Sequence, residues 1–317
     1  MDTNIVVLDG YTLNPGDLSW APLLRLGRVR IYPRSTPAEG LERAQGAAVV
    51  VVNKFVVDEA FLAGLPDLRM IAVTATGINN IDLAAAKRRG IAVSNVRGYG
   101  TESVAQHVFA ALLALINRPE AHNHSVAQGR WSAQPDFSYW LSPIITLSGK
   151  TLGIYGYGAI GQSVARIGRA FGMEVLVCSR RPPSDPEPGI AFVDLETLFR
   201  RSLVLSLHAT LTPENAGIVA APMLSLMPAG SYLINTSRGG LVNEADLLEA
   251  LTHGPLAGAA LDVLNQEPPP PDHPLLGLPN CLVTPHMAWA ARESRERLLQ
   301  LSADNVEAFL SGEGGNL

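Results

Sequence analysis

The sequence predicts an α/β protein with two doubly wound parallel-sheet domains. Its 317 residues correspond to two domains at about 150 residues each. Short apolar runs alternate with helical patterns along most of the chain, in two successive series. A hydrophobic content of 47% with 17% charged residues is typical of a folded chain with a large core and excludes intrinsic disorder.

The first series of apolar runs predicts four buried strands separated or followed by helices. Strands that are almost wholly apolar and alternate with helices are typical of a parallel sheet covered on both faces. The expected strands are Ile5–Leu8, Ala48–Val52, Met70–Val73 and Ile91–Val93, and the expected helices are Asp58–Ala63, Asp82–Arg89 and Glu102–Asn117.

The second series begins after Lys150 and has the same architecture without a sequence repeat. Its expected strands are Thr151–Tyr155, Glu174–Cys178, Leu203–Leu207, Ser231–Asn235, Leu256–Leu261 and Cys281–Val283. The tail Ala290–Leu310 predicts an amphipathic helix that returns to the first series. We therefore expect one discontinuous domain, 1–99 plus 288–317, and one continuous domain, 100–287.

One stretch, Ala121–Leu147, fits neither the strand nor the helix pattern. It carries the aromatic residues Trp131, Phe137, Tyr139 and Trp140 among polar residues and prolines. Aromatic residues are enriched at protein interfaces. The stretch is therefore either a packed loop or an interface arm.

Charge and composition exclude several classes of function. With 24 basic and 29 acidic residues the net charge is −5, which argues against a nucleic-acid binder. No run of about 18 apolar residues predicts a membrane span, and the first residues have no signal-peptide pattern, so we expect a cytoplasmic protein. The two cysteines, Cys178 and Cys281, form no CxxC, so we expect neither a disulfide scaffold nor a metal site.

A glycine-rich motif, G-x-G-x-x-G, directly follows the strand Thr151–Tyr155 and opens an expected helix, Ala159–Phe171. In that context the motif predicts a Rossmann dinucleotide site. The first glycine permits a tight turn, the second lets a pyrophosphate approach the backbone, and the third lets helix and strand pack closely. The cofactor-binding residues predicted here are Gly156, Tyr157, Gly158, Ala159, Ile160 and Gly161.

The residues after the next strand, Glu174–Cys178, indicate which dinucleotide is used. An acid normally binds the adenosine ribose at this position, whereas this chain has Ser179, Arg180 and Arg181. A hydroxyl and two guanidinium groups suit a 2′-phosphate. The pattern favours NADP(H), and NAD(H) stays possible because Asp185 follows closely.

Three further signals follow strands of the second series. Arg238 comes after Ser231–Asn235 and is able to bind a carboxylate through two parallel hydrogen bonds. Glu267 comes after Leu256–Leu261, and His286 follows Cys281–Val283. A carboxylate beside a histidine orients the ring and favours the imidazolium, which is able to donate a proton to a carbonyl oxygen.

These motifs together resemble the D-isomer-specific 2-hydroxyacid dehydrogenase family over essentially the whole chain. The matching stretches are Gly156–Gly161, Asn235–Val242 with Glu244, Gly258–Val263 with Glu267-Pro268, and Thr284–His286 with Ala288-Trp289. The segments Leu8–Leu18 and Tyr99–His107 are most similar to the glycerate dehydrogenase branch, which includes hydroxypyruvate and glyoxylate reductases. The chain departs from the family at Gln106, where glutamate is common, and at Thr210, where proline is common.

The resemblance implies a role for each matching residue. Arg238, Glu267 and His286 would be catalytic, with Arg238 and His286 also contacting the substrate. Asp262 and Thr101 would lie near the nicotinamide, and the backbone of Ala75, Thr76 and Gly77 would hold the substrate carboxylate. The resemblance also implies that residues 100–287 form a Rossmann dinucleotide-binding domain and that residues 1–99 plus 288–317 form a flavodoxin-like substrate domain. It further implies a cleft between the two domains and a homodimer.

The expected activity is the NADPH-preferring reduction of small 2-oxo acids, hydroxypyruvate or glyoxylate, to 2-hydroxy acids. Three alternatives stay open: an NAD-dependent phosphite dehydrogenase, another D-2-hydroxyacid dehydrogenase, and an NAD(H)-sensing scaffold similar to transcriptional corepressors on this fold. A formate dehydrogenase is disfavoured because that enzyme resembles the family but carries glutamine where Glu267 stands.

Overall fold

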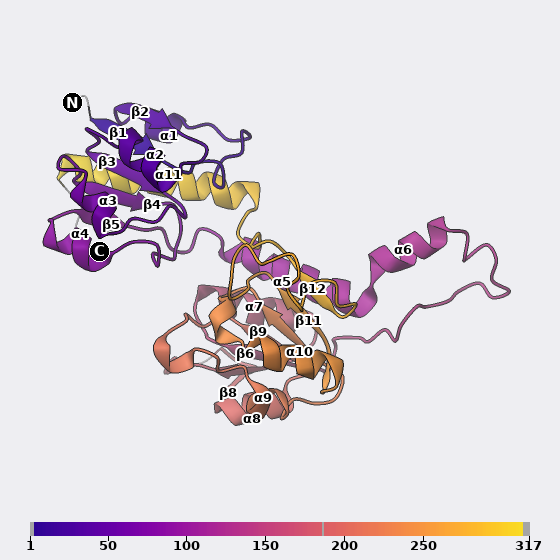
Figure 1. Cartoon of the computed structure of the whole chain (residues 1–317). Coiled ribbons are helices and arrows are strands. Elements are labelled where there is room, and N and C mark those ends of the chain that lie inside the picture. The colour runs from indigo at the N-terminus through magenta and orange to yellow at the C-terminus, as the bar shows by residue number, and fades with distance from the viewer. Residues whose placement is uncertain (1–2, 186, 313–317) are drawn as a thin grey trace. The chain divides into compact units, whose positions relative to one another are not determined.

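The computed structural model describes residues 3–185 and 187–312 of the chain. The chain folds as two compact units (Figure 1). One comprises Met1–Gly100 and Ala290–Leu317, and the other comprises Thr101–Trp289. Residues 1–2 and 313–317 of the expected substrate domain lie outside the described residues.

The first unit contains a five-stranded parallel sheet. Its strands pair in the order β2-β1-β3-β4-β5, which is the flavodoxin-like arrangement. The three central strands are fully apolar apart from Asn4, and their side chains are almost all buried. The strands are β1 (Asn4–Val7), β2 (Arg28–Ile31), β3 (Val49–Val52), β4 (Met70–Val73) and β5 (Ala92–Ser94).

Within the described part of this unit five helices accompany the sheet, and three of them begin at a side-chain cap. Thr36, Asp58 and Asp82 each accept a hydrogen bond from a backbone N–H of the first helical turn, which satisfies a donor that the helix leaves unpaired. The helix from the end of the chain, α11, packs on β4 and on α1. The helices are α1 (Ala21–Leu24), α2 (Pro37–Arg43), α3 (Glu59–Ala63), α4 (Leu83–Arg88) and α11 (Arg292–Ser311).

The second unit contains a seven-stranded parallel sheet. The order β12-β11-β10-β9-β6-β7-β8 is the Rossmann order with one added strand. β7 and β8 extend the sheet to one side of β6, and β9 to β12 extend it to the other side. The point between β6 and β9 where the strand order reverses is where this fold binds its ligands. The strands are β6 (Thr151–Tyr155), β7 (Glu174–Cys178), β8 (Ile190–Phe192), β9 (Val204–Leu207), β10 (Ser231–Asn235), β11 (Leu256–Leu261) and β12 (Cys281–Val283).

The helices of this unit pack on the sheet through two separate clusters of buried apolar side chains. The long helix α5 packs on α7, β10 and β11, whereas α8 packs on β6 and β7 and α10 packs on β11. The helices are α5 (Thr101–Asn117), α7 (Ala159–Ala170), α8 (Leu195–Arg201), α9 (Ala221–Leu224) and α10 (Glu244–Thr252), with the short 3-10 turns η1 (Pro213–Asn215) and η2 (Gly239–Leu241).

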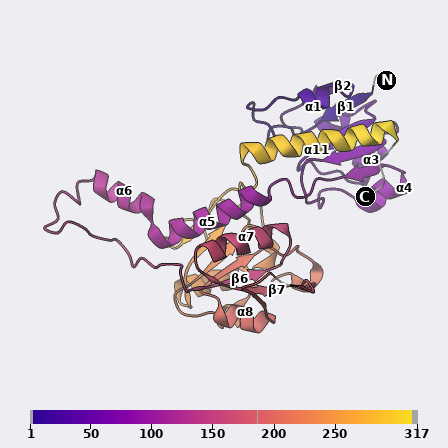
Figure 2. The same cartoon turned by 180° about the vertical axis from the view of Figure 1, so that it is seen from behind.

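The aromatic-rich stretch begins with a helix, α6 (Pro119–Ala127), that the sequence pattern did not indicate. Arg118 has a left-handed backbone, with φ of 46°, and separates α6 from α5. In both views, α6 and the segment that follows it extend away from the sheet of this unit (Figures 1 and 2). In the segment after α6, Phe137 and Trp140 are 89% and 67% exposed.

In the part of the chain that the structure describes, no helix is both long enough and apolar enough to span a bilayer.

Candidate active site

The glycine-rich loop lies between β6 and α7, and each of its glycines has a different reason to lack a side chain. Gly156 has φ of +99°, and a Cβ there would lie 2.5 Å from the backbone nitrogen of Ala209. A Cβ on Gly161 would lie 2.2 Å from the carbonyl oxygen of Gly156. Gly158 faces open space instead, so the backbone there is accessible to a ligand. Gly158 is also the N-cap of α7 and provides no side-chain cap, so the first N–H groups of the helix point to this space.

The residues after β7 are polar and accessible. Ser179 is partly buried, whereas Arg180 and Arg181 are exposed. Arg180 lies near Glu214, whose pKa is held below its usual range mainly by a hydrogen bond from Thr212 and in part by the charge of Arg180. Asp185 is exposed further along the loop. Two cationic side chains are therefore available at the position where an adenosine ribose would be bound.

The side chains of His286 and Glu267 form a hydrogen-bonded pair. His286 Nδ1 lies 2.6 Å from Glu267 Oε2, and the two side chains are 27% and 35% exposed. The other oxygen of Glu267 accepts a hydrogen bond from the backbone N–H of Leu264 at 3.1 Å. The carboxylate thus fixes the ring through Nδ1, and Nε2 is the nitrogen left to meet a substrate.

Asp262 holds the backbone on both sides of His286. Its side chain is only 1% exposed. Oδ1 accepts hydrogen bonds from the hydroxyl of Thr284 at 2.5 Å and from the N–H of Met287 at 2.9 Å, and Oδ2 accepts one from the N–H of Ala288 at 2.8 Å. His286 itself has a left-handed backbone, with φ of 52°. The buried carboxylate therefore supports an uncommon backbone conformation at His286.

Arg238 follows β10 in a turn that Asn235 supports. The Asn235 side chain is fully buried, donates to the carbonyl of Arg238 at 2.9 Å and accepts from the N–H of Ser237 at 3.0 Å. A Cβ on the next residue, Gly239, would lie 2.1 Å from the carbonyl carbon of Leu264. The turn of Arg238 therefore packs directly on the loop that carries Glu267.

The remaining predicted site residues lie at element ends. Thr101 is buried at the first position of α5. In the first unit, the loop Ala75–Gly77 follows β4, and its carbonyl groups accept hydrogen bonds from the N–H of Val96 and from the side chain of Asn95. Among the described residues, none accepts a hydrogen bond from the backbone N–H of Thr76 or Gly77.

Three polar residues beside these sites had no role from the sequence. His107 on α5 lies 3.1 Å from the hydroxyl of Thr284. Asp9, after β1, accepts hydrogen bonds from the backbone N–H groups of Asn53, Lys54 and Phe55. His208 lies beside the glycine-rich loop, and burial lowers its pKa to about 3, so it stays neutral.

The comparisons with known proteins identify the family of the chain. Residues 109–288 match the family described as D-isomer specific 2-hydroxyacid dehydrogenase, NAD binding domain. The chain therefore belongs to the D-isomer-specific 2-hydroxyacid dehydrogenase family and is an oxidoreductase of that class. The expected fold, with two parallel-sheet domains, is confirmed.

Three similar proteins illustrate the relationship. A hydroxypyruvate reductase of Blautia hydrogenotrophica is 42% identical over 317 residues, with 99% of this chain and 98% of the relative covered. A glycerate dehydrogenase of Methylorubrum extorquens is 44% identical over 284 residues, covering 89% of this chain and 88% of the relative. The solved structure of an acyclic imino acid reductase, Bsp5, in complex with NADPH and D-Arg is 29% identical, with a TM-score of 0.85 and 99% of both chains covered.

Proposed function

We propose that the protein reduces small 2-oxo acids, such as hydroxypyruvate and glyoxylate, and uses NADPH in preference to NADH. The observation that carries this proposal is the 2.6 Å hydrogen bond between His286 and Glu267, in the same unit as the glycine-rich loop. A relative named as a hydroxypyruvate reductase, similar over almost the whole chain, supports the choice of substrate class.

The glycine-rich loop fits a dinucleotide. The open space at Gly158 admits a pyrophosphate to the backbone, and the first turn of α7 offers N–H groups and the positive end of a helix dipole. When bound, the nicotinamide supplies a hydride to the carbonyl carbon of the substrate. The chain's own residues bind that carbonyl, hold it in place and supply the proton.

His286 provides the proton. In the imidazolium form both ring nitrogens carry hydrogen, so Nδ1 donates to Glu267 while Nε2 donates to the substrate oxygen. As the carbonyl carbon gains a hydride, its oxygen takes the proton from Nε2, and the product is a neutral hydroxyl group. His286 is then neutral and still donates from Nδ1 to the Glu267 carboxylate. General acid catalysis of this kind typically contributes about 10²–10⁴-fold to a rate.

Arg238 is the proposed partner of the substrate carboxylate. One of its Nη atoms donates to the carbonyl of Ser237 at 2.7 Å, which fixes the plane of the guanidinium. A guanidinium has five N–H donors, so two others suffice for a bidentate contact with a carboxylate. The backbone N–H groups of Thr76 and Gly77 are proposed as further donors to the same group.

The preference for NADPH rests on charge. Arg180 and Arg181 are exposed after β7, and Ser179 lies where an acid would repel a 2′-phosphate. Glu214 lies near Arg180 and competes for its charge, and Asp185 offers an acceptor to a ribose hydroxyl. The balance of two guanidinium groups against these acids favours the phosphorylated cofactor.

A turnover assay tests the function. The purified chain is given NADPH or NADH with glyoxylate, hydroxypyruvate or pyruvate, and oxidation of the reduced nicotinamide is followed by its absorbance. In a separate arm the chain is given NAD⁺ or NADP⁺ with phosphite. We expect turnover with the 2-oxo acids, with a higher kcat/KM for NADPH than for NADH. Turnover with phosphite alone would overturn the proposed reaction, and cofactor binding without any turnover would indicate a scaffold.

The protein is proposed to be a homodimer whose interface includes α6 and the segment after it. This segment leaves the body of its own unit, and it exposes Trp131, Phe137, Trp140 and Ile144. Aromatic side chains of this size are typical of interface cores. Light scattering should give twice the mass of one chain, and Phe137→Ser with Trp140→Ser should give the mass of one. A single-chain mass for the unaltered protein would contradict the proposal.

A further inference from the structure

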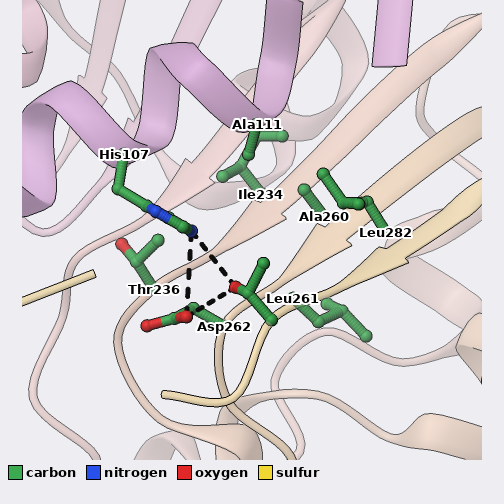
Figure 3. Close-up of a pocket in the computed structure, with 9 residues that line it drawn as sticks. His107, Ala111, Ile234, Thr236, Ala260, Leu261, Asp262 and Leu282 are labelled. Atoms are coloured by element: carbon green, nitrogen blue, oxygen red, sulfur yellow. Dashed lines mark hydrogen bonds and ion pairs between the residues drawn. The ribbon is translucent and has the colours of Figure 1, made fainter. Parts of the chain in front are cut away.

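A chain of hydrogen bonds connects α5 to the loop of His286, with Asp262 buried and His107 and Thr284 partly buried. Nε2 of His107 lies 3.1 Å from Oγ1 of Thr284, and Oγ1 of Thr284 lies 2.5 Å from Oδ1 of Asp262. Figure 3 shows the ring of His107 pointing toward the carboxylate of Asp262. His107 Nε2 also lies 3.7 Å from Oδ1 of Asp262, so the ring faces the carboxylate directly as well.

The direction of the hydrogen bonds follows from the number of protons. Thr284 has one hydroxyl hydrogen, and the short contact to the Asp262 carboxylate uses it. The hydroxyl oxygen must then accept from His107, so Nε2 of His107 carries a hydrogen. Each of the three hydrogen-bonded groups thus has one role: His107 donates, Thr284 accepts from His107 and donates to Asp262, and Asp262 accepts.

The surroundings make these contacts costly to lose. The space into which His107 points is lined mostly by apolar side chains, among them Ala111, Ile234, Ala260 and Leu282, and Thr236 is a further polar residue of its lining. Asp262 is 1% exposed, and no lysine or arginine among the described residues forms a salt bridge with it. In such surroundings a carboxylate is stable only with a full set of donors, and the ring of His107 faces it at 3.7 Å in addition to the donors of Thr284, Met287 and Ala288.

The chain of hydrogen bonds from His107 ends at the backbone beside His286. The same Asp262 carboxylate accepts from the N–H groups of Met287 and Ala288, so its position sets the backbone on one side of His286, while Thr284 sets the other. We propose that His107 is a positioning residue for catalysis: through Thr284 and Asp262 it holds the backbone of His286 so that the imidazole meets the substrate oxygen. This inference rests on the proposed role of His286 as the proton donor.

The size of the effect follows from geometry. His107 contacts neither the proposed substrate partners nor the glycine-rich loop, so it should act on kcat more than on binding. Misplacing a reacting group by about 1 Å costs about 10²-fold in rate. We therefore expect His107→Leu to lower kcat by about 10–10²-fold, with little change in the Kd of NADPH or in the KM of the 2-oxo acid.

Conservative variants separate positioning from bulk packing. His107→Gln places an amide N–H near the original Nε2 and should restore most of kcat, and Thr284→Ser should retain activity where Thr284→Val loses it. A matched control is His253→Leu, because His253 is an exposed histidine on the surface beyond α10 and should leave kcat unchanged.

The decisive arm combines His107→Leu with His286→Ala. If His107 acts through His286, the residual kcat of the double variant should equal that of His286→Ala alone. A further loss, or no loss in His107→Leu on the wild-type background, would overturn the inference.

A second readout does not depend on turnover. In the protein labelled with ¹⁵N-histidine, the Nδ1 proton of His286 should give a low-field NMR signal because of its short hydrogen bond to Glu267. This signal should shift or broaden in His107→Leu and return in His107→Gln. If the unaltered chain turns over no 2-oxo acid, the proposed function fails, and the NMR comparison still decides whether His107 positions His286. An unchanged signal in His107→Leu would refute the positioning role.

Discussion

Nδ1 of His286 lies 2.6 Å from Oε2 of Glu267, although the two residues are separated by 19 positions in the sequence. The contact forms because β11 and β12 are adjacent parallel strands, so the segments that follow them leave the sheet at the same edge. Glu267 is also oriented by the N–H of Leu264, so its position does not depend on His286 alone.

The first prediction concerns this pair. Glu267→Gln keeps the shape of the side chain but removes the negative charge that stabilises the imidazolium of His286. Loss of a hydrogen bond to a charged group costs about 1.5–3 kcal/mol, so kcat should fall about 10–10²-fold. The check is kcat with a saturating 2-oxo acid and NADPH, and an unchanged kcat would contradict the pairing.

A second prediction concerns the guanidinium of Arg238. Arg238→Lys retains the charge but loses the planar, two-point geometry that matches a carboxylate. The loss of one hydrogen bond to the substrate carboxylate in this variant should lower kcat/KM for every 2-oxo acid by about 10–10²-fold. The Kd of NADPH, measured by fluorescence titration, should change little. A variant with unchanged kcat/KM would mean that Arg238 does not bind the substrate carboxylate.

The third prediction concerns the cofactor. A charge-assisted contact from arginine to phosphate contributes about 1.5–3 kcal/mol, so one well-formed contact gives about tenfold preference for NADPH. Ser179→Asp combined with Arg180→Ala should reverse this preference, because the new carboxylate repels the phosphate and binds a ribose hydroxyl. Arg200→Ala, at an exposed arginine on α8, serves as the control.

Two refinements sharpen that cofactor test. Glu214→Gln should increase the preference for NADPH, since it removes an acid near Arg180. The preference should also weaken with added salt, because exposed charges are screened over about 8–10 Å. Equal Kd values for NADPH and NADH in the unaltered chain would indicate that both arginines face solvent and that Asp185 or the backbone holds the ribose.

A fourth prediction concerns stability of the first unit. Arg295 on α11 makes a bidentate ion pair with Asp17, at 2.8 and 2.6 Å, and its hydrogen bond is the main reason that the pKa of Asp17 lies below its usual range. A carboxyl whose pKa is depressed by folding contributes stability above its unfolded pKa, near pH 4, and this stability is lost as the pH falls through the folded value.

Asp17→Asn should therefore lower Tm at neutral pH, and the difference from wild type should shrink as the pH falls below about 4. Asp67→Asn, at an exposed aspartate of the same unit, is the control and should show no such dependence. Thermal unfolding followed by circular dichroism at several pH values measures both. A Tm difference independent of pH would show that the ion pair is not its cause.

Much of the fold was predictable because interior parallel strands are apolar on both faces. Runs such as Val49–Val52 have no other simple interpretation between two helical segments. Two edge strands, β2 and β8, were missed, whereas the edge strands β5 and β12 were expected. In β2, Arg28 and Arg30 alternate with apolar residues, so it shows no continuous apolar run, and β8 is a short run of only three residues.

The site was predictable where strand ends carry unusual side chains. Arg238, Glu267 and His286 each follow a strand of one parallel sheet, and such ends meet at one edge. His107 was not predictable in this way, because it lies on a helix and meets Thr284 and Asp262 only through the packing of α5 on the sheet. Spacing along one helix cannot indicate which strand ends will lie beneath it.

Proton donation by His286 when a 2-oxo acid is reduced is the step on which the proposed function depends, and single-turnover hydride transfer measures it. Wild type and His286→Ala, each loaded with NADPH, are mixed rapidly with hydroxypyruvate, and the loss of the reduced nicotinamide is followed in time. We expect transfer in the wild type and a rate about 10²–10⁴-fold lower in the variant, with a similar Kd for NADPH. A near-wild-type rate of transfer in His286→Ala would show that His286 is not the proton donor.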